Sequence, residues 1–400
     1  MWEQIRSNQM RSAFLIGILG ALLLVVGYFL GMAFGGNGIA GILVAAVVWA
    51  IMLLIAYFQG DSILLSVAGA QKITAEDHPQ LYNIVEEMKI ASGLEKMPEI
   101  YIVDDPAMNA FATGRSKDRT AVTVTSGLLQ NLNRDELEGV IGHEVSHIKN
   151  RDVLLMSLAG VLLGTIVILA WYGTRVLFYS GMANRRSSSR SSGGGQVIVL
   201  AVALVLMILA PIAAQLLYFA ISRKREYLAD ASSALYTRYP EGLASALEKL
   251  GASTKQLKNA NNATAPMYTI NPFHKEGREA TDLTSTHPPI SERIRILRAM
   301  AGASPADYER AYEQVTNKKI IPGSVLATAG SVALRAPSAE TRGVEADRIQ
   351  RTRETSDMLL RMNNYKIIAC PNCGTRYKIP PDYTEPGIIC ARCGNPVNLR

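Results

Sequence analysis

The sequence predicts a mainly α-helical membrane protein with four transmembrane helices in two hairpins, a cytosolic α+β domain with a small sheet, and a small cysteine-rich domain at the C-terminus. Three observations lead to this prediction. Apolar residues gather in four long uncharged runs, each long enough to cross about 30 Å of hydrocarbon as a helix. The polar stretch after the second run has the periodicities of strands and helices. All four cysteines lie at or beyond residue 370.

The first predicted hairpin joins residues 13–34 and 39–58 through the four residues GGNG. So short a connection favours two helices that cross the bilayer and return at once. A cleaved signal peptide is the alternative for the first run. That run is too long, however, lacks a good small-residue cleavage site and is followed directly by a second apolar run. We therefore expect both runs to remain as transmembrane helices.

The second predicted hairpin consists of residues 153–174 and 196–221, and Pro211 is expected to kink its second helix. Basic residues near the ends of the runs set the orientation, because they are retained in the cytoplasm. The loop 175–195 carries four arginines and opposes this orientation. The side that holds the N-terminus and residues 59–152 carries more, so we expect that side to be cytoplasmic.

The charge distribution limits the classes of partner. The formal net charge is +7, and most of the excess lies at membrane borders, where basic residues interact with anionic lipid. The sequence lacks the clustered basic face typical of nucleic-acid binding, so we expect no nucleic-acid partner. It also lacks a Walker-type phosphate loop, so ATP-driven unfolding is not expected of this chain.

A two-histidine motif lies in the stretch EGVIGHEVSHIKN, where His143 and His147 stand one helical turn apart. Asn133 fits an N-cap with Glu136 as its capping-box partner, so the stretch is predicted to be helical. A catalytic zinc takes imidazole nitrogens and keeps one position for water. Glu144 is the candidate general base, because the glutamate of this motif takes the proton of that water. The alternative is a pair of solvated or packed histidines, but with only five histidines in the chain chance is a poor explanation.

A catalytic zinc needs a third protein ligand on the same side of the membrane. The stretch ISRKREYLADASSALY, residues 221–236, follows the second predicted hairpin and returns the chain to the histidines. Glu226 is the candidate ligand, and Asp230 one turn later can orient a ligand histidine. The alternative is that Glu226 only balances the basic residues before it in a solvated charge pattern.

The cysteines form two C-x-x-C pairs separated by sixteen residues. This spacing is typical of two knuckles that close one tetrahedral zinc site, and four thiolates leave no position for water. We therefore expect a structural zinc ribbon; the alternative is a redox pair of C-x-x-C motifs. Its ligands are Cys370, Cys373, Cys390 and Cys393.

Together these motifs carry a family resemblance. The order HEVSH, a hydrophobic hairpin and EYLAD, with MNAFATG at 108–114 and STHPPISERI at 285–294, resembles the HtpX-type integral-membrane zinc metalloproteases over roughly residues 1–300. These are gluzincins related to the CAAX prenyl proteases. The resemblance implies a cytosolic gluzincin catalytic domain in which His143, His147 and Glu226 bind zinc and Glu144 is the general base.

The resemblance implies further roles around the zinc. Residues Asn109, Ala110, Phe111 and Ala112 would form an edge strand on which the substrate backbone pairs, as in strand addition; the alternative is a plain loop. His287 would help to stabilise the oxyanion of the tetrahedral intermediate, with Arg293 supporting the same region. A histidine before two prolines is otherwise an ordinary turn residue.

The expected function is that of a zinc endopeptidase in a bacterial inner membrane, with its catalytic domain in the cytoplasm. Its substrates would be misfolded or damaged membrane proteins with unfolded cytosolic segments, and its cofactors one catalytic and one structural Zn²⁺. The lipid bilayer is a partner, and the ribbon leaves room for a protein partner. The alternatives are a CAAX-type protease of prenylated proteins and a non-catalytic membrane adaptor that recruits partners through the ribbon.

These predictions divide the chain into six segments. They are an N-terminal transmembrane hairpin (1–58), a first catalytic part (59–152), a second hydrophobic hairpin (153–221), a second catalytic part (222–318), a linker with a charged helix (319–364) and the ribbon (365–400).

Overall fold

The computed structural model describes most of the chain outside the second predicted hairpin. The described residues are 2–35, 37–116, 118–153, 223–258, 268–270, 288–321, 323–327, 330–338 and 344–399, together with scattered positions between 166 and 212. Apart from Val153 and those scattered positions, the apolar runs 153–174 and 196–221 lie outside the described residues. His287 lies outside them as well.

The first predicted hairpin is present as two long helices, α1 (Trp2–Gly35) and α2 (Gly38–Ala68). Asn37 between them is the N-cap of α2 and accepts a hydrogen bond from the amide of Ala40 at 3.1 Å. Among the described residues, α2 is the one helix long and apolar enough to cross a membrane, judged by length and composition, and α1 contains a shorter apolar stretch, Ile16–Met32.

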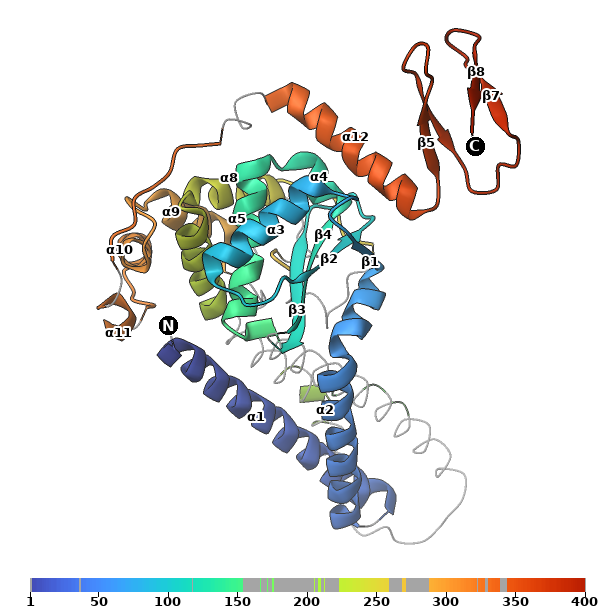
Figure 1. Ribbon diagram of the computed structural model, residues 1–400. Helices are drawn as coiled ribbons and strands as arrows, with labels where there is room; N and C mark the ends of the chain where they lie inside the picture. The colour runs from blue at the N-terminus through green and yellow to red at the C-terminus, as the bar shows by residue number, and fades with distance from the viewer. Residues whose placement is uncertain are drawn as a thin grey trace.

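Glycines let these two helices pack closely. A Cβ added at Gly41 would lie 2.1 Å from the carbonyl oxygen of Gly27 and 2.8 Å from the Cα of Gly31. Small residues at a helix crossing let the backbones approach within a membrane. The hairpin projects from the rest of the molecule as an elongated unit (Figure 1).

The second helix continues directly into the sheet. Gly69 ends α2 with φ of 68°, and its amide bonds back to the last turn. A left-handed residue at this position favours glycine, which has no Cβ to clash. Strand β1 (Ala70–Ile73) begins at the next residue, so one residue separates the apolar helix α2 from the sheet.

The sheet has four strands in the order β1-β2-β4-β3. Strand β2 pairs antiparallel with β1 and parallel with β4, and β3 pairs antiparallel with β4. β4 is buried on both faces along Ala121–Thr125, whereas its alternating sequence predicts burial of only one face. The remaining strand bounds are β2 Glu99–Val103, β3 Ala110–Ser116 and β4 Arg119–Thr125.

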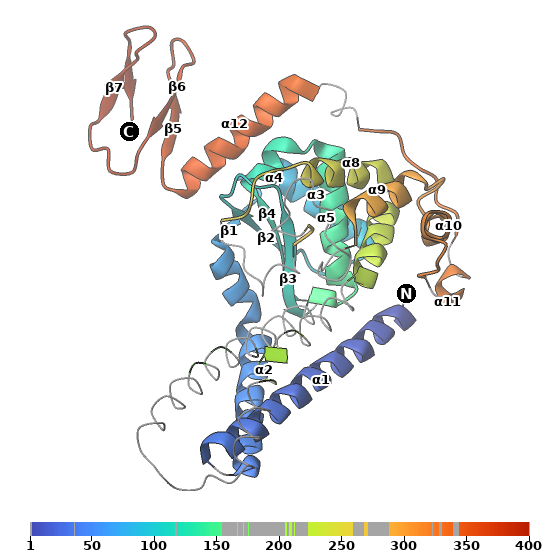
Figure 2. The same cartoon turned by 180° about the vertical axis from the view of Figure 1, so that it is seen from behind.

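Helices cover one side of this sheet and form the core with it (Figures 1 and 2). The most buried is α5 (Arg134–Lys149), whose residues 135–148 are all buried. Its predicted capping box is confirmed: Asn133 Oδ1 accepts from the amide of Glu136 at 2.9 Å, and Glu136 Oε2 accepts from the amide of Asn133 at 2.8 Å. The other helices are α3 (Pro79–Ser92), α4 (Ser126–Asn131), an unlabelled helix over 223–237, α8 (Pro240–Gly251), α9 (Ile290–Arg298) and α10 (Pro305–Thr316).

The C-terminal part first contacts the catalytic part and then continues to the cysteine-rich hairpins. Residues 330–338 of the predicted linker lie against the catalytic part: Arg335 bonds to the carbonyl oxygen of Thr237 at 2.9 Å and to Asp135 Oδ1 at 2.8 Å. The charged stretch then forms α12, which packs on α4 and leads to the cysteine-rich hairpins at the end of the molecule opposite the α1–α2 hairpin (Figure 2). The bounds are α11 Gly323–Leu326, α12 Val344–Met362, β5 Lys366–Ala369, β6 Arg376–Ile379, β7 Gly387–Ile389 and β8 Pro396–Asn398.

We expect Gly139→Ala to lower the free energy of unfolding. A Cβ at this position would lie 2.6 Å from the backbone nitrogen of Leu243 in α8, and overpacking of this kind costs about 1–3 kcal/mol. The measurement is the thermal unfolding midpoint of the protein in detergent. Gly323→Ala is the matched control, because it also changes a helical glycine and its Cβ meets nothing within 4 Å. Equal midpoints for both variants would contradict the close α5–α8 contact.

Candidate metal centre

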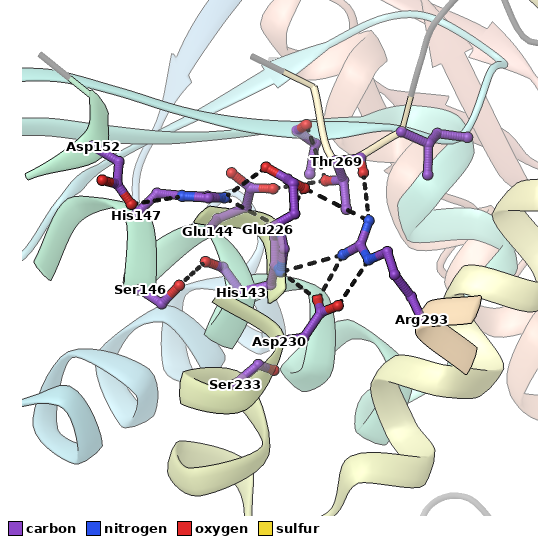
Figure 3. A network of polar contacts seen from close by, with 12 residues as sticks. His143, Glu144, Ser146, His147, Asp152, Glu226, Asp230, Ser233, Thr269 and Arg293 are labelled. Atoms are coloured by element: carbon purple, nitrogen blue, oxygen red, sulfur yellow. Dashed lines mark hydrogen bonds and ion pairs between the residues drawn. The ribbon is translucent and has the colours of Figure 1, made fainter. Parts of the chain in front are cut away.

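Two helices bring the predicted ligands together. His143 and His147 come from α5, and Glu226 comes from the helix over 223–237. The Nε2 atoms of the two histidines lie 3.2 Å apart. Glu226 Oε2 lies 3.5 Å from Nε2 of His143, and Glu226 Oε1 lies 3.5 Å from Nε2 of His147. All three side chains are buried, and Figure 3 shows them converging from the two helices.

This geometry fits a zinc ion. Zinc bonds of about 2.0–2.1 Å at tetrahedral angles place neighbouring ligand atoms roughly 3.3 Å apart, which is close to the observed separations of 3.2 and 3.5 Å. Two imidazoles and one carboxylate also match the donor set of catalytic zinc sites. The three residues are therefore suited to hold one zinc ion with a fourth position left for water.

Carboxylates on the far side of each imidazole orient these histidines. Asp230 Oδ1 lies 2.9 Å from Nδ1 of His143, and Asp152 Oδ2 lies 3.4 Å from Nδ1 of His147. Such partners fix the tautomer and the direction of a ligand histidine. The sequence predicts Asp230 but not Asp152, whose only signal is its place just after the end of α5.

A buried arginine holds Asp230 in turn. Arg293 of α9 donates from Nε to Asp230 Oδ2 at 2.8 Å and from Nη2 to Asp230 Oδ1 at 2.6 Å. Both side chains are fully buried. A two-point pair of this kind is strong and directional. The structure therefore connects Arg293 to the predicted zinc ligands through Asp230 and His143.

The charges of the cluster favour a cation. Burial lowers the pKa of His143, but the carboxylates of Asp230 and Glu226 outweigh burial and raise that pKa to about 9. Burial raises the pKa of Asp230, but the Arg293 guanidinium and His143 lower it more strongly. Ionised carboxylates around the imidazoles therefore attract positive charge to the point where the ligand atoms meet.

Glu144 lies beside the ligands without being one of them. Its side chain is 1% exposed, and Oε1 accepts a hydrogen bond from the hydroxyl of Thr269 at 2.7 Å. Figure 3 shows its carboxylate next to Glu226. Nothing in the sequence indicates the contact with Thr269, because the two residues are 125 positions apart.

The remaining predicted residues of this region have mixed outcomes. Asn109 precedes β3, and Ala110, Phe111 and Ala112 begin it, at one end of the strand order. Their pairing with substrate stays a prediction. The role of His287 stays a prediction, since that residue is outside the described part of the chain.

The four cysteines gather at the other end of the molecule. Sγ of Cys370 lies 3.6 Å from that of Cys393, and Sγ of Cys373 lies 3.5 Å from that of Cys390. Zinc–sulfur bonds of about 2.3 Å at tetrahedral angles give a sulfur separation of roughly 3.8 Å. The hydroxyl of Tyr377 donates to Cys390 at 3.0 Å and lowers the pKa of that thiol to about 5.

Each cysteine pair forms a tight turn that ends in glycine. Gly374 and Gly394 have φ of 70° and 74°, and their amides bond to the carbonyl oxygens of Cys370 and Cys390 at 2.9 and 2.8 Å. Glycine is the residue that adopts this left-handed conformation at little cost. The two turns face one another, so all four sulfur atoms point to one place.

Fold and cluster together define a zinc-dependent metalloprotease: two histidines one turn apart on a buried helix, with a glutamate from a second helix, beside a small sheet. Residues 75–301 match the model of peptidase family M48, and the chain belongs to that family. This result confirms the predicted resemblance to HtpX-type membrane metalloproteases and the predicted hydrolysis of peptide bonds.

Two HtpX homologues agree with this placement. The chain is 46% identical over 299 residues to the Protease HtpX homolog of Dictyoglomus turgidum, which covers 75% of this chain and 94% of the relative. It is 40% identical over 301 residues to the Protease HtpX homolog of Lactobacillus helveticus, over 75% of this chain and 100% of the relative. The crystal structure of S. mikatae Ste24p aligns with 74% of this chain and 67% of its own, with a TM-score of 0.39 and 19% identity.

We expect Asp230→Asn to weaken zinc binding roughly 10- to 100-fold, because the carboxylate that orients a ligand histidine is lost. The measurement is competition for zinc with a chromophoric chelator. Asp105→Asn is the matched control: Asp105 is also buried but accepts from the amides of Ala107 and Lys258, both at 2.9 Å. Unchanged zinc affinity in Asp230→Asn would show that the contact with His143 does not support the metal.

Proposed function

We propose that this chain is a multi-pass endopeptidase of a bacterial inner membrane that cleaves misfolded or damaged membrane proteins at the cytoplasmic face. The observation that carries the proposal is the pair of imidazole nitrogens 3.2 Å apart, each of them 3.5 Å from one carboxylate oxygen of Glu226, with Glu144 beside them. In it, His143, His147 and Glu226 hold the zinc ion, and Glu144 is the general base.

The proposed chemistry divides among the residues of the cluster. When bound, zinc acts as a Lewis acid that polarises the peptide carbonyl and makes water a better nucleophile. Glu144 takes the proton of the attacking water and delivers it to the leaving amine. Asp230 and Asp152 accept from Nδ1 of the two imidazoles, which fixes the tautomer and directs Nε2 at the metal. His287 is proposed to stabilise the developing oxyanion, a role that needs a donor at that oxygen.

The proposed location rests on the junction between α2 and the sheet. One residue, Gly69, joins α2 to β1, so the catalytic domain stays close to the end of the membrane helix. Basic residues at the N-terminal side support a cytoplasmic domain. The second hydrophobic hairpin, which would complete four spans, is part of the proposal. Segments that reach the site would be unfolded loops or tails, since the sequence contains no Walker-type loop.

The cysteine-rich hairpins are proposed to be a zinc ribbon. Supporting this, the four sulfur atoms lie within 4.8 Å of one another, and their hairpins have only a small apolar cluster around the cysteines. Domains of this size need the metal to fold. The zinc is therefore structural, and the ribbon surface is left for a protein partner.

We expect Glu144→Gln to reduce cleavage of an unfolded, non-prenylated membrane protein by about 10²- to 10⁴-fold, the usual contribution of a general base. The measurement is the cleavage rate in detergent with zinc-loaded protein, with zinc content determined in parallel. Glu248→Gln is the matched control, because that side chain is 59% exposed and pairs with Arg298. Wild-type cleavage by fully loaded Glu144→Gln would contradict the assignment. Cleavage restricted to prenylated substrates would favour the CAAX-type alternative.

We expect the wild-type chain to bind about two zinc ions, one at each tetrahedral site. Cys373→Ser/Cys390→Ser and His143→Ala/His147→Ala should each retain about one, as measured by elemental analysis of purified protein. The cysteine variant should still cleave an unfolded substrate if its metal is structural. A single zinc ion in the wild type would contradict the proposal. So would a cysteine variant that holds zinc fully at the catalytic site and no longer cleaves the substrate.

A further inference from the structure

The outer edge of β3 is occupied by another segment of the same chain. The amide of Thr269 donates to the carbonyl oxygen of Ala110 at 2.9 Å, and Phe111 forms an antiparallel bridge with Tyr268. The side-chain amide of Asn109 donates to the carbonyl oxygen of Ile270 at 3.1 Å. The residues expected to pair with substrate therefore already have a backbone partner, Tyr268–Ile270.

This segment also reaches the proposed general base. The hydroxyl of Thr269 donates to Glu144 Oε1 at 2.7 Å, and its carbonyl oxygen accepts from Arg293 Nη1 at 3.2 Å. Thr269 is 1% exposed. Figure 3 shows Thr269 above the predicted zinc ligands, between Glu144 and Arg293. One residue thus covers the edge strand and the base at once.

The segment is held on its other side by the membrane helix. Tyr268 packs edge-to-face on Phe111, with ring centres 5.2 Å apart at 75°. Both rings belong to a small apolar cluster with Leu64 and Ala68 at the end of α2. Contacts with the membrane helix therefore contribute to keeping the segment on β3.

Within the described part of the chain, the pairing is short compared with what the edge can accept. The described residues Tyr268–Ile270 make one bridge with β3, whereas β4 pairs with the opposite edge over six registered positions. An extended substrate backbone would form a longer ladder with the same row of groups, which is how strand addition gains affinity. Two backbones cannot occupy that row together, so the longer one displaces the shorter.

We propose that the outer edge of β3 is an exchange surface, on which Tyr268–Ile270 and an extended segment of substrate backbone bind in turn. The inference rests on the proposed function, since it takes β3 as the substrate strand. While the segment is in place, the base is bonded to Thr269 and the edge is closed. Binding of a long unfolded substrate displaces the segment, which frees Glu144 from Thr269 and exposes the edge of β3.

The experiment locks the segment with a disulfide. Positions paired across an antiparallel bridge have Cα atoms about 4.5–5.5 Å apart, a distance that a disulfide spans. We expect Phe111→Cys/Tyr268→Cys to lose at least about 10-fold in kcat/KM for unfolded casein on oxidation and to recover on reduction, a change of about 1.4 kcal/mol. Phe111→Ser/Tyr268→Ser is the matched control, because it cannot be cross-linked and still carries the four native cysteines through the same oxidation. Its activity should not change on oxidation.

Two results would overturn the proposal. The first is a protein that forms the disulfide, as shown by peptide mass spectrometry, and still cleaves casein at the rate of its reduced form. The second is failure of the two cysteines to form a disulfide under oxidant, because the bridge itself would then be absent.

A binding measurement separates this inference from the proposed function. In a Glu144→Gln background, labelled casein should bind the reduced cysteine pair at least about 10-fold more tightly than the oxidised pair. This difference needs no cleavage, so it tests exchange even if the wild type cuts no casein. Equal affinities would refute exchange, whatever the wild type cleaves.

Hydrogen exchange gives a test that leaves Phe111 and Tyr268 in place. In Glu144→Gln alone, peptides that contain Thr269 should exchange at least about 10-fold faster when casein is saturating, while peptides from β4 should not change. Unchanged or slower exchange at Thr269 would show that the segment stays on β3 while substrate is bound.

Discussion

The packing of α5 against the helix over 223–237 is the contact on which the rest of the site depends, because the three proposed ligands come from these two helices. Small groups set their separation. Ser233 donates its hydroxyl to the carbonyl oxygen of Gly139 at 2.7 Å, and a Cβ at Gly142 would lie 3.1 Å from the same hydroxyl. Interiors packed to this density resist even one added methyl group. Two imidazoles and a carboxylate from separate helices can therefore meet at one point without a flexible side chain bridging a gap.

Local signals were enough to predict part of this site. The capping box and the apolar spacing defined α5, and one helical turn between His143 and His147 placed both imidazoles on one face. Asp152 and Thr269 could not be found in this way. Asp152 follows Arg151, which takes φ of 58°, and lies against His147 beyond the end of α5. Thr269 meets Glu144 through a long-range contact. The first two strands are four and five residues long, and their pairing is decided by partners far along the chain, which a local pattern does not reveal. His287 and the second hairpin remain predictions.

The C-terminal extension is joined to the catalytic part by specific contacts, although the family match ends at residue 301. Arg335 bonds to the N-terminal half of α5 through Asp135 and to the last turn of the helix over 223–237 through Thr237. Farther along, α12 packs on α4, and Thr355 and Met358 of α12 are buried. The extension thus contacts both helices that supply the proposed ligands and fixes the direction in which the cysteine-rich hairpins leave the domain.

The single residue between α2 and β1 has a consequence for where a substrate can be cut. A flexible linker would let the catalytic domain sample many heights above the bilayer, whereas a helix that passes into a sheet through Gly69 gives it one. The separation between the end of α2 and the three proposed ligand residues is then set by the fold. An anchored substrate would be cut at a set spacing from its own membrane segment. The positions of its cleavage sites would then depend on the distance from that membrane segment as well as on the local sequence.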